Sequence, residues 1–159
     1  MAAVTTLSWG VKQSFRAYVE GAGGKTETSE GAQTAADGGF VFPAGPDSTL
    51  ALDEAGKLTG RGTFTGIVHF EAHGGMLKVW MVDPILEITD AGAVLTVADH
   101  PTRTYRLEAA RLDLGAMATD PGDLALPAAL LMFGSQWLGG NYPAGTALDP
   151  VRLGVGRID

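Results

Sequence analysis

The side chains that can do chemistry are concentrated near the start of the chain and in its middle. The opening stretch LSWGVKQSFRAYVEG carries Ser14 and Tyr18. Residues four apart lie on the same face of an α-helix, so a helix here would place the two hydroxyl groups one turn apart. Each also has an ordinary explanation, because a tyrosine often packs its ring and leaves its hydroxyl in water, and a helical serine can bond to its own backbone.

Three histidines are the other candidate ligands or proton carriers. His73 precedes two glycines, where it is either a functional residue or simply a turn residue. His69 lies on the opposite face of a predicted strand from Phe70, and we expect it to face solvent. His100, next to a proline, is expected in a loop. Spacing alone leaves these alternatives open.

Several classes of protein are disfavoured by the sequence. There is no cysteine, which excludes disulfides, zinc–thiolate sites and cysteine catalysis. The histidines lack the HExxH spacing of a zinc hydrolase, and the GxSxG, P-loop and dinucleotide-binding motifs are absent. The net charge of −7, with no basic run, argues against nucleic acid as a partner. No apolar run approaches the roughly 18 residues of a membrane span, so we expect a soluble chain.

Most of the elements that must position these side chains are predicted to be β-strands. The 23 glycines separate many short apolar runs, which is typical of an antiparallel β fold. Alternating residues over 63–72, the turn HGG and the return run MLKVWMV predict a hairpin with His73 at its tip. Residues 22–37 are small and polar and predict a loop.

Two segments are instead expected to be helical. Residues 8–19 have apolar side chains at helical spacing, with Ser8 as the N-cap, and consecutive glycines follow. LPAALLMFGSQWL, residues 126–138, predicts a second helix with Pro127 in its first turn and Gly139–Gly140 after its end. We therefore expect a single domain over residues 1–159. Its fold is expected to be mainly β, an antiparallel β-sandwich or partly closed barrel with two short α-helices.

Four segments in a characteristic order give the chain a family resemblance. They are LSWGVKQSFRAYVEG, GGFVFP, GTFTGIVHFEAHGGMLKVWMVDPILEI and YPAGTALDPV. Together they resemble the haem-transport-associated (HtaA-type) domain family over residues 7–151. The pattern WGxKxSFxxYV in the first segment and FxxHxGxL in the third are the most specific parts, whereas the loop after residue 20 and residues 99–125 match poorly.

The resemblance implies a domain that binds haem b, ferric protoporphyrin IX, through a tyrosine of the first helix. The position that matches the axial iron ligand is Tyr18, and Ser14 matches a serine near the haem. His73, rather than His69, matches the hairpin histidine that hydrogen-bonds the ligating phenol. Ferric iron favours the phenolate form of such a ligand, and an imidazole bonded to its oxygen would orient it.

A haem macrocycle needs an apolar slot, and Phe15 and Phe70 are candidate wall residues, to which Val11 or Met76 would add. Each of these also fits plain core packing. The function implied is haem uptake, transfer or storage, with haem and another haem-binding protein as partners.

The sequence leaves two alternative functions open. One is a tyrosinate-ligated haem enzyme, such as a peroxide-dependent oxidoreductase, with His100, Arg103 or Tyr105 on the open side of the iron. The other is a β-sandwich interaction module without haem. By resemblance the protein would be secreted or at the cell surface, but MAAVTTLSWG lacks the features of a signal peptide, which leaves a cytoplasmic location open.

Overall fold

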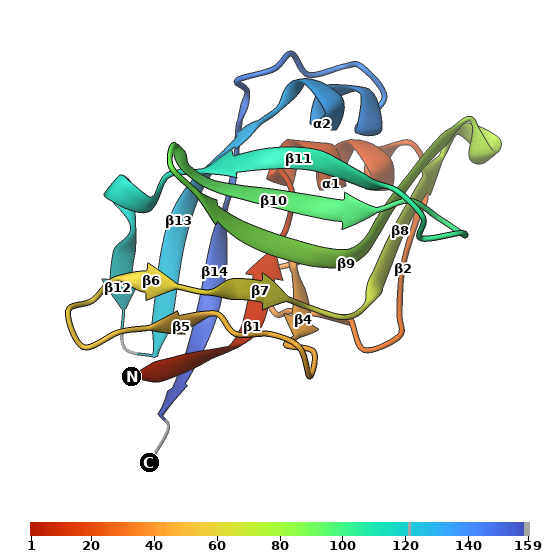
Figure 1. Cartoon of the computed structure of the whole chain (residues 1–159). Helices are drawn as coiled ribbons and strands as arrows, with labels where there is room; N and C mark the ends of the chain where they lie inside the picture. The colour runs from red at the N-terminus through yellow and green to blue at the C-terminus, as the bar shows by residue number, and fades with distance from the viewer. Residues whose placement is uncertain (121, 158–159) are drawn as a thin grey trace.

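Antiparallel strands make up most of the computed structural model, which describes residues 1–120 and 122–157 (Figure 1). The strands are β1 (Ala2–Trp9), β2 (Lys25–Ser29), β3 (Gln33–Thr34), β4 (Phe40–Pro43), β5 (Ala51–Leu52), β6 (Leu58–Thr59), β7 (Arg61–Thr63), β8 (Ile67–Ala72), β9 (Leu77–Thr89), β10 (Gly92–Ala98), β11 (Arg106–Leu112), β12 (Ala118–Asp120), β13 (Asp123–Leu130) and β14 (Ala147–Arg157). Two α-helices, α1 (Gln13–Gly21) and α2 (Met132–Trp137), and two single-turn 3₁₀ segments, η1 (His73–Gly75) and η2 (Leu114–Ala116), complete the described elements.

One sheet contains these strands in the order β2-β8-β9-β10-β11-β13-β14-β1-β4-β3, with β5, β6, β7 and β12 paired at its margins. The chain passes from β2 to β3 through only three residues, 30–32, so the two ends of this order are joined by a short turn. The sheet is therefore strongly curved and nearly closed (Figure 1). The expectation of a mainly β, partly closed barrel with two short α-helices is confirmed.

The predicted hairpin is formed by β8 and β9, whose register runs from Ile67 opposite Val82 to Ala72 opposite Leu77. Phe70 points into the core, and the neighbouring side chains along β8 point outward, as the alternating sequence predicts. At the tip, His73, Gly74 and Gly75 all have positive φ, of 54°, 63° and 94°. Glycine adopts this backbone freely and histidine does so rarely, so the two glycines allow the tight turn that places His73.

The first helix begins later than the sequence predicts, and Ser8 is not its N-cap. Residues 2–9 form β1, where Ser8 lies opposite Arg152 of β14 and Val41 of β4. The helix starts at Gln13, after Val11 has taken a left-handed backbone with a φ of 64°. Strand pairing on both sides supplies the backbone hydrogen bonds of residues 2–9, and at residues 8 and 9 it outweighs the helical spacing of the apolar side chains.

The second predicted helix is also shorter, because its first half belongs to a strand. Pro127 lies in β13 rather than in the first turn of a helix, and only Met132–Trp137 are helical. Proline cannot donate a ladder hydrogen bond, and the β13–β14 register shifts between Leu126 and Ala128, which leaves Pro127 in a bulge. Gly139 has a φ of 89°, so the predicted end of this helix is correct.

The segment predicted as a loop over residues 22–37 contains β2 and β3. The side chains of β2 are mostly exposed, so no apolar alternation marks it in the sequence. Its order comes from pairing with β8, in which Lys25 lies opposite Glu71 and Ser29 opposite Ile67. An edge strand of this kind is held by main-chain hydrogen bonds rather than by side-chain burial.

The first helix packs against the barrel core through Phe15 and Val19, each 1% exposed. The Phe15 ring meets that of Phe70 edge-on, with centroids 5.2 Å apart, and Phe70 meets Phe40 in the same way at 5.5 Å. Such aromatic pairs contribute roughly 0.5–1.5 kcal/mol beyond the burial of their area. The exposed face of α1 is therefore held in a defined orientation.

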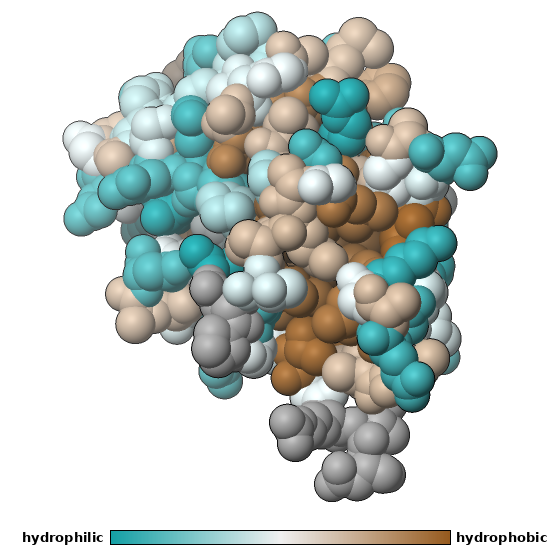
Figure 2. All heavy atoms as spheres, turned by 90° about the vertical axis from the view of Figure 1, so that its left-hand side faces the viewer, coloured by the Kyte–Doolittle hydropathy of each residue, from teal (hydrophilic) through white to brown (hydrophobic). Residues whose placement is uncertain are grey.

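Away from the two helices, the face that carries β5, β6 and β12 exposes an apolar strip (Figure 2). Two shallow hollows there are lined by apolar side chains, which include Leu52, Leu58, Ile88, Leu114, Met117, Leu124 and Val155. Among the described residues, no helix has the length and hydropathy needed to cross a membrane.

Candidate functional site

The start of α1 is anchored by side chains from the far end of the chain. The Asp149 carboxylate, on β14, accepts a hydrogen bond from the Gln13 N–H at 3.1 Å. It also forms an ion pair with the Arg16 guanidinium at 2.6 Å. The same Arg16 guanidinium donates to the Gly10 carbonyl at 2.7 Å. Lys12 also reaches β14, where its ammonium donates to the Ala147 carbonyl at 2.9 Å. These contacts fix the direction in which α1 leaves the sheet.

The end of α1 packs directly against β8, the strand that leads to the hairpin tip. The Gly24 N–H donates to the Val19 carbonyl at 2.8 Å. A Cβ atom at Gly24 would lie 2.3 Å from the carbonyl oxygen of Glu71 and 2.7 Å from that of Val19. Only glycine allows this approach, so the helix and the hairpin share a tight junction.

This junction brings together Tyr18 and His73, the two most specific residues of the predicted site. The Tyr18 hydroxyl and the His73 Nε2 form a hydrogen bond, and their ring centroids lie 5.5 Å apart at 60°. Tyr18 is 44% exposed, and His73 is exposed as well. The hydroxyl donates when His73 carries its proton on Nδ1, and a phenolate oxygen would accept from an Nε2–H. The pair can thus hold or pass a proton at the protein surface.

Ser14 lies one turn before Tyr18 and, like it, is exposed, so the two hydroxyls lie on the same side of α1. The Ser14 Oγ lies 3.4 Å from the Tyr142 hydroxyl, and the two share a hydrogen bond. Tyr142 comes from the connection between α2 and β14, where its carbonyl accepts a hydrogen bond from Ser135. Its ring packs against Phe15, with centroids 6.4 Å apart.

Sequence reasoning did not select Tyr142 as a site residue. It lies in the segment YPAGTALDPV, one of the four that carry the family resemblance, and that was the available signal. Nothing in the spacing of the sequence connects position 142 with position 14, because only the path of β14 beside β1 brings the two ends of the chain together.

The four expected wall residues occupy different environments. Phe15, Phe70 and Val11 are 1%, 0% and 0% exposed, so they form the base under α1. Met76 is 91% exposed, close in sequence to His73 at the hairpin tip. Contact of Phe15 and Phe70 with a ligand stays a prediction, while their support of the helix that carries Tyr18 is observed.

The other two histidines lie on the outer face of the barrel. The Trp80 ring is sandwiched between His69 and His100, with centroids 3.7 Å and 3.5 Å away and planes within 9° and 5° of parallel. The expectation that His69 faces solvent is wrong, because its side chain is only 13% exposed under this stack. Burial lowers the pKa of His69 below its ordinary value, and its Nε2 has no hydrogen-bond partner among the described residues.

The residues considered for the open side of a haem iron are engaged elsewhere. His100 is expected in a loop, and it does lie between β10 and β11, stacked on Trp80. Arg103, in the same loop, forms ion pairs with Asp83, at 3.1 Å, and with Glu30. Tyr105 faces a hollow on the outside of the barrel. These three therefore do not assemble with Tyr18 and His73.

Comparisons with known proteins find solved structures with the same fold. The N-terminal domain of HtaA from Corynebacterium glutamicum is 26% identical, has a TM-score of 0.74 and is matched over 99% of each chain. The C-terminal domain of the same protein is 28% identical, with a TM-score of 0.68, and the match covers 98% of this chain and 100% of that one. The heme-binding protein HtaB from C. glutamicum, at 22% identity and a TM-score of 0.67 over 98% and 96% of the two chains, shares the fold.

A search of curated proteins found no match. The sequence model of one protein family, HtaA, described as "Htaa", matches residues 4–154. Because this match extends over nearly all of the chain and includes both the α1 segment and the β8–β9 hairpin, the protein belongs to the HtaA family.

Proposed function

We propose that this protein binds ferric haem as a cargo, with the phenolate oxygen of Tyr18 as the iron ligand and His73 as its hydrogen-bonding partner. The observation that carries the proposal is the hydrogen bond between these two side chains, which come from separate elements and meet at the surface. Membership of the HtaA family and the fold shared with a protein described as heme-binding support it.

The chemistry of this pair suits a ferric ligand. A phenol in neutral water keeps its proton, whereas a hard cation such as Fe(III) favours the phenolate. The His73 Nε2 is in place to accept the departing proton. The resulting imidazolium would then donate its Nε2–H to the phenolate oxygen, which stabilises the negative charge and holds the ring in place.

The surroundings of the pair suit capture and release. Tyr18 is partly exposed, so a flat ligand can approach its oxygen without an opening of the barrel. Ser14 and Tyr142 present hydroxyls on the same side of α1, where they are candidates to bond the haem propionates. One protein ligand at an open edge favours uptake, transfer or storage, with another haem-binding protein as donor or acceptor.

The alternative of a haem enzyme has less support. A peroxide-dependent reaction needs a polar side chain on the free side of the iron, and the three candidates lie elsewhere in the structure. His100 stacks on Trp80, Arg103 is paired with two carboxylates, and Tyr105 lines a separate hollow.

A hemin titration of purified protein followed by visible absorption tests the ligand. Tyr18→Phe keeps the ring and removes the oxygen, and Tyr18→Ala removes both, so both variants should lose the tyrosinate spectrum and most of the affinity. Tyr105→Phe is the matched control, because Tyr105 is 74% exposed and belongs to the connection between β10 and β11 rather than to α1. An unchanged titration of both Tyr18 variants would rule out this ligand, and circular dichroism shows whether each variant is folded.

A further inference from the structure

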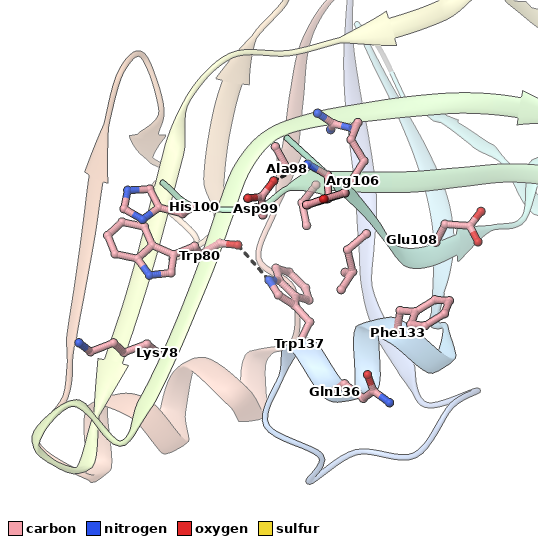
Figure 3. Close-up of a pocket in the computed structure, with 13 residues that line it drawn as sticks. Lys78, Trp80, Ala98, Asp99, His100, Arg106, Glu108, Phe133, Gln136 and Trp137 are labelled. Atoms are coloured by element: carbon pink, nitrogen blue, oxygen red, sulfur yellow. Dashed lines mark hydrogen bonds between the residues drawn. The ribbon is translucent and has the colours of Figure 1, made fainter. Parts of the chain in front are cut away.

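The hollow that Tyr105 faces lies on the outside of the barrel, between α2 and the outer face of β9, β10 and β11, with a volume of about 780 Å³ (Figure 3). We call it the outer groove. Its lining includes Trp80, His100, Tyr105, Phe133 and Trp137, whereas Ser14, Tyr18 and His73 do not line it. The volume falls in the range of about 300–1,000 Å³ that is usual for small-molecule sites.

The walls of the outer groove are held in place by contacts within the protein. Trp80 and His100 stack with centroids 3.5 Å apart. The Trp137 indole N–H, from α2, donates to the Trp80 carbonyl at 2.9 Å, the dashed line in Figure 3. Gly134 allows α2 to lie close to the sheet, since a Cβ there would come within 2.2 Å of the Ala109 carbonyl oxygen. The groove is therefore largely formed before any ligand arrives.

The outer groove exposes aromatic surface that the fold itself does not bury. Tyr105, just before β11, is 74% exposed, and Phe133, on α2, is 49% exposed. Both line the groove. Flat rings bind well to such surfaces, because aromatic contacts add about 0.5–1.5 kcal/mol to the burial of apolar area.

The charges at the outer groove are not equally available to a ligand. Arg106 is held by Thr96, whose hydroxyl and carbonyl lie 2.9 Å and 3.0 Å away, and Asp99 accepts the Tyr105 N–H at 2.6 Å. Lys78 and Glu108 form no ion pair with a described residue. They lie at different ends of the groove, with Lys78 toward the β8–β9 hairpin and Glu108 toward Phe133 (Figure 3).

We propose that the outer groove is a second binding site, and that it takes a planar aromatic carboxylate. The ring would lie against Phe133 and the Trp80–His100 stack. The carboxylate would point toward the ammonium of Lys78 and away from Glu108. The inference does not depend on haem binding, because the residues that carry it are separate from Tyr18 and His73.

The test uses 1-pyrenecarboxylate, a flat fluorescent ring with one carboxylate, and 1-pyrenemethanol, the same ring without charge. Fluorescence anisotropy of each probe is measured against increasing apoprotein. The carboxylate should bind in a saturable way to the wild type. Phe133→Ala should lower the affinity for both probes by about tenfold, which is the effect expected from the loss of aromatic contact. Met132→Ala is the matched control, since Met132 is 63% exposed on the same helix and does not line the groove.

The charge is tested separately with Lys78→Gln. This change should lower the affinity for 1-pyrenecarboxylate by up to about fivefold, as expected for an exposed ion pair. The affinity for 1-pyrenemethanol should not change. Lys57→Gln, at an exposed lysine outside the groove lining, should alter neither probe. Equal effects of Lys78→Gln on the two probes would overturn the assignment of the carboxylate to Lys78.

Two further outcomes would overturn the site itself. One is the absence of saturable probe binding to the wild type. The other is an equal loss of probe affinity in Phe133→Ala and Met132→Ala. Tyr18→Ala should keep full affinity for 1-pyrenecarboxylate, and loss of binding in that variant would place the probe at Tyr18 instead. Hemin titration is a separate measurement, so failure of the haem proposal and failure of this one are distinguishable.

Discussion

The phenol oxygen of Tyr18 is hydrogen-bonded to Nε2 of His73, a residue 55 positions further along the chain. The helix that carries Tyr18 is anchored to β14 by Asp149, and His73 occupies a hairpin tip with left-handed backbone. The contact therefore depends on two separately held elements.

Replacement of His73 should be milder than replacement of Tyr18. His73→Ala leaves the phenol as a ligand but removes its hydrogen-bonding partner, so we expect hemin affinity to fall by about 10–100-fold, with a shifted visible spectrum. Alanine at a positive φ is strained, and His73→Gly separates this strain from the loss of the imidazole. A hemin spectrum and affinity equal to wild type in both variants would contradict the role of His73.

The anchor of α1 should contribute measurably to stability. Arg16 and Asp149 form a partly buried pair, with side chains 19% and 30% exposed, and we expect Asp149→Asn to lower the free energy of unfolding by about 1–3 kcal/mol. Urea unfolding measures this. The exposed pair Arg61–Glu87 is the control, and Glu87→Gln should change stability by less than about 1 kcal/mol. Equal effects at the two sites would show that the anchor does not stabilise α1.

Gly24 should not tolerate a side chain. The Cβ of Gly24→Ala would collide with the backbone carbonyls of Glu71 and Val19, so α1 and β8 must separate, at a cost of about 1–3 kcal/mol. Gly21→Ala is the matched control, because a Cβ there would meet no atom from outside its own helix within 4 Å and alanine is the better helix former. Thermal unfolding of the two variants decides the matter, and similar melting temperatures would refute the close junction.

His69 should make stability depend on pH. Burial lowers its pKa below the ordinary 6.5, so the unfolded chain binds a proton at a pH where the folded chain does not. Stability is then complete above about pH 6.5 and falls as the pH drops toward the folded pKa. His69→Phe keeps a ring against Trp80 and should flatten this dependence. Urea unfolding from about pH 5 to 7.5 tests it, and identical slopes for variant and wild type would contradict it.

The hairpin and the ends of the helices could be predicted from local sequence alone. The period-two pattern of 63–72 and the glycines of HGG are sufficient for β8, β9 and the tip, because alternation and turn chemistry act over a few residues. Consecutive glycines likewise end both helices, since they take backbone angles that other residues avoid. The family resemblance added Tyr18 and His73 as partners, and the two side chains do meet.

Three segments were misassigned for one physical reason. Residues 8–9 and 126–130, predicted as helix, and residues 25–29, predicted as loop, are in strands because other strands supply their backbone hydrogen bonds, and these partners lie far away in sequence. Local propensity and apolar spacing do not contain that information. The same limit applies to the burial of His69 and the sandwich of Trp80, which require the outer face of β8 and β9 and the 99–105 loop to be assembled.

By itself the sequence determined the mainly β class, the hairpin with His73 at its tip and, through its motifs, the family. Only the tertiary structure decided where α1 begins, that Tyr142 meets Ser14 and that an aromatic groove lies outside the barrel. The physical reason is that hydrogen bonds and ring contacts between distant segments form only when the sheet curves and brings β1 and β14 side by side.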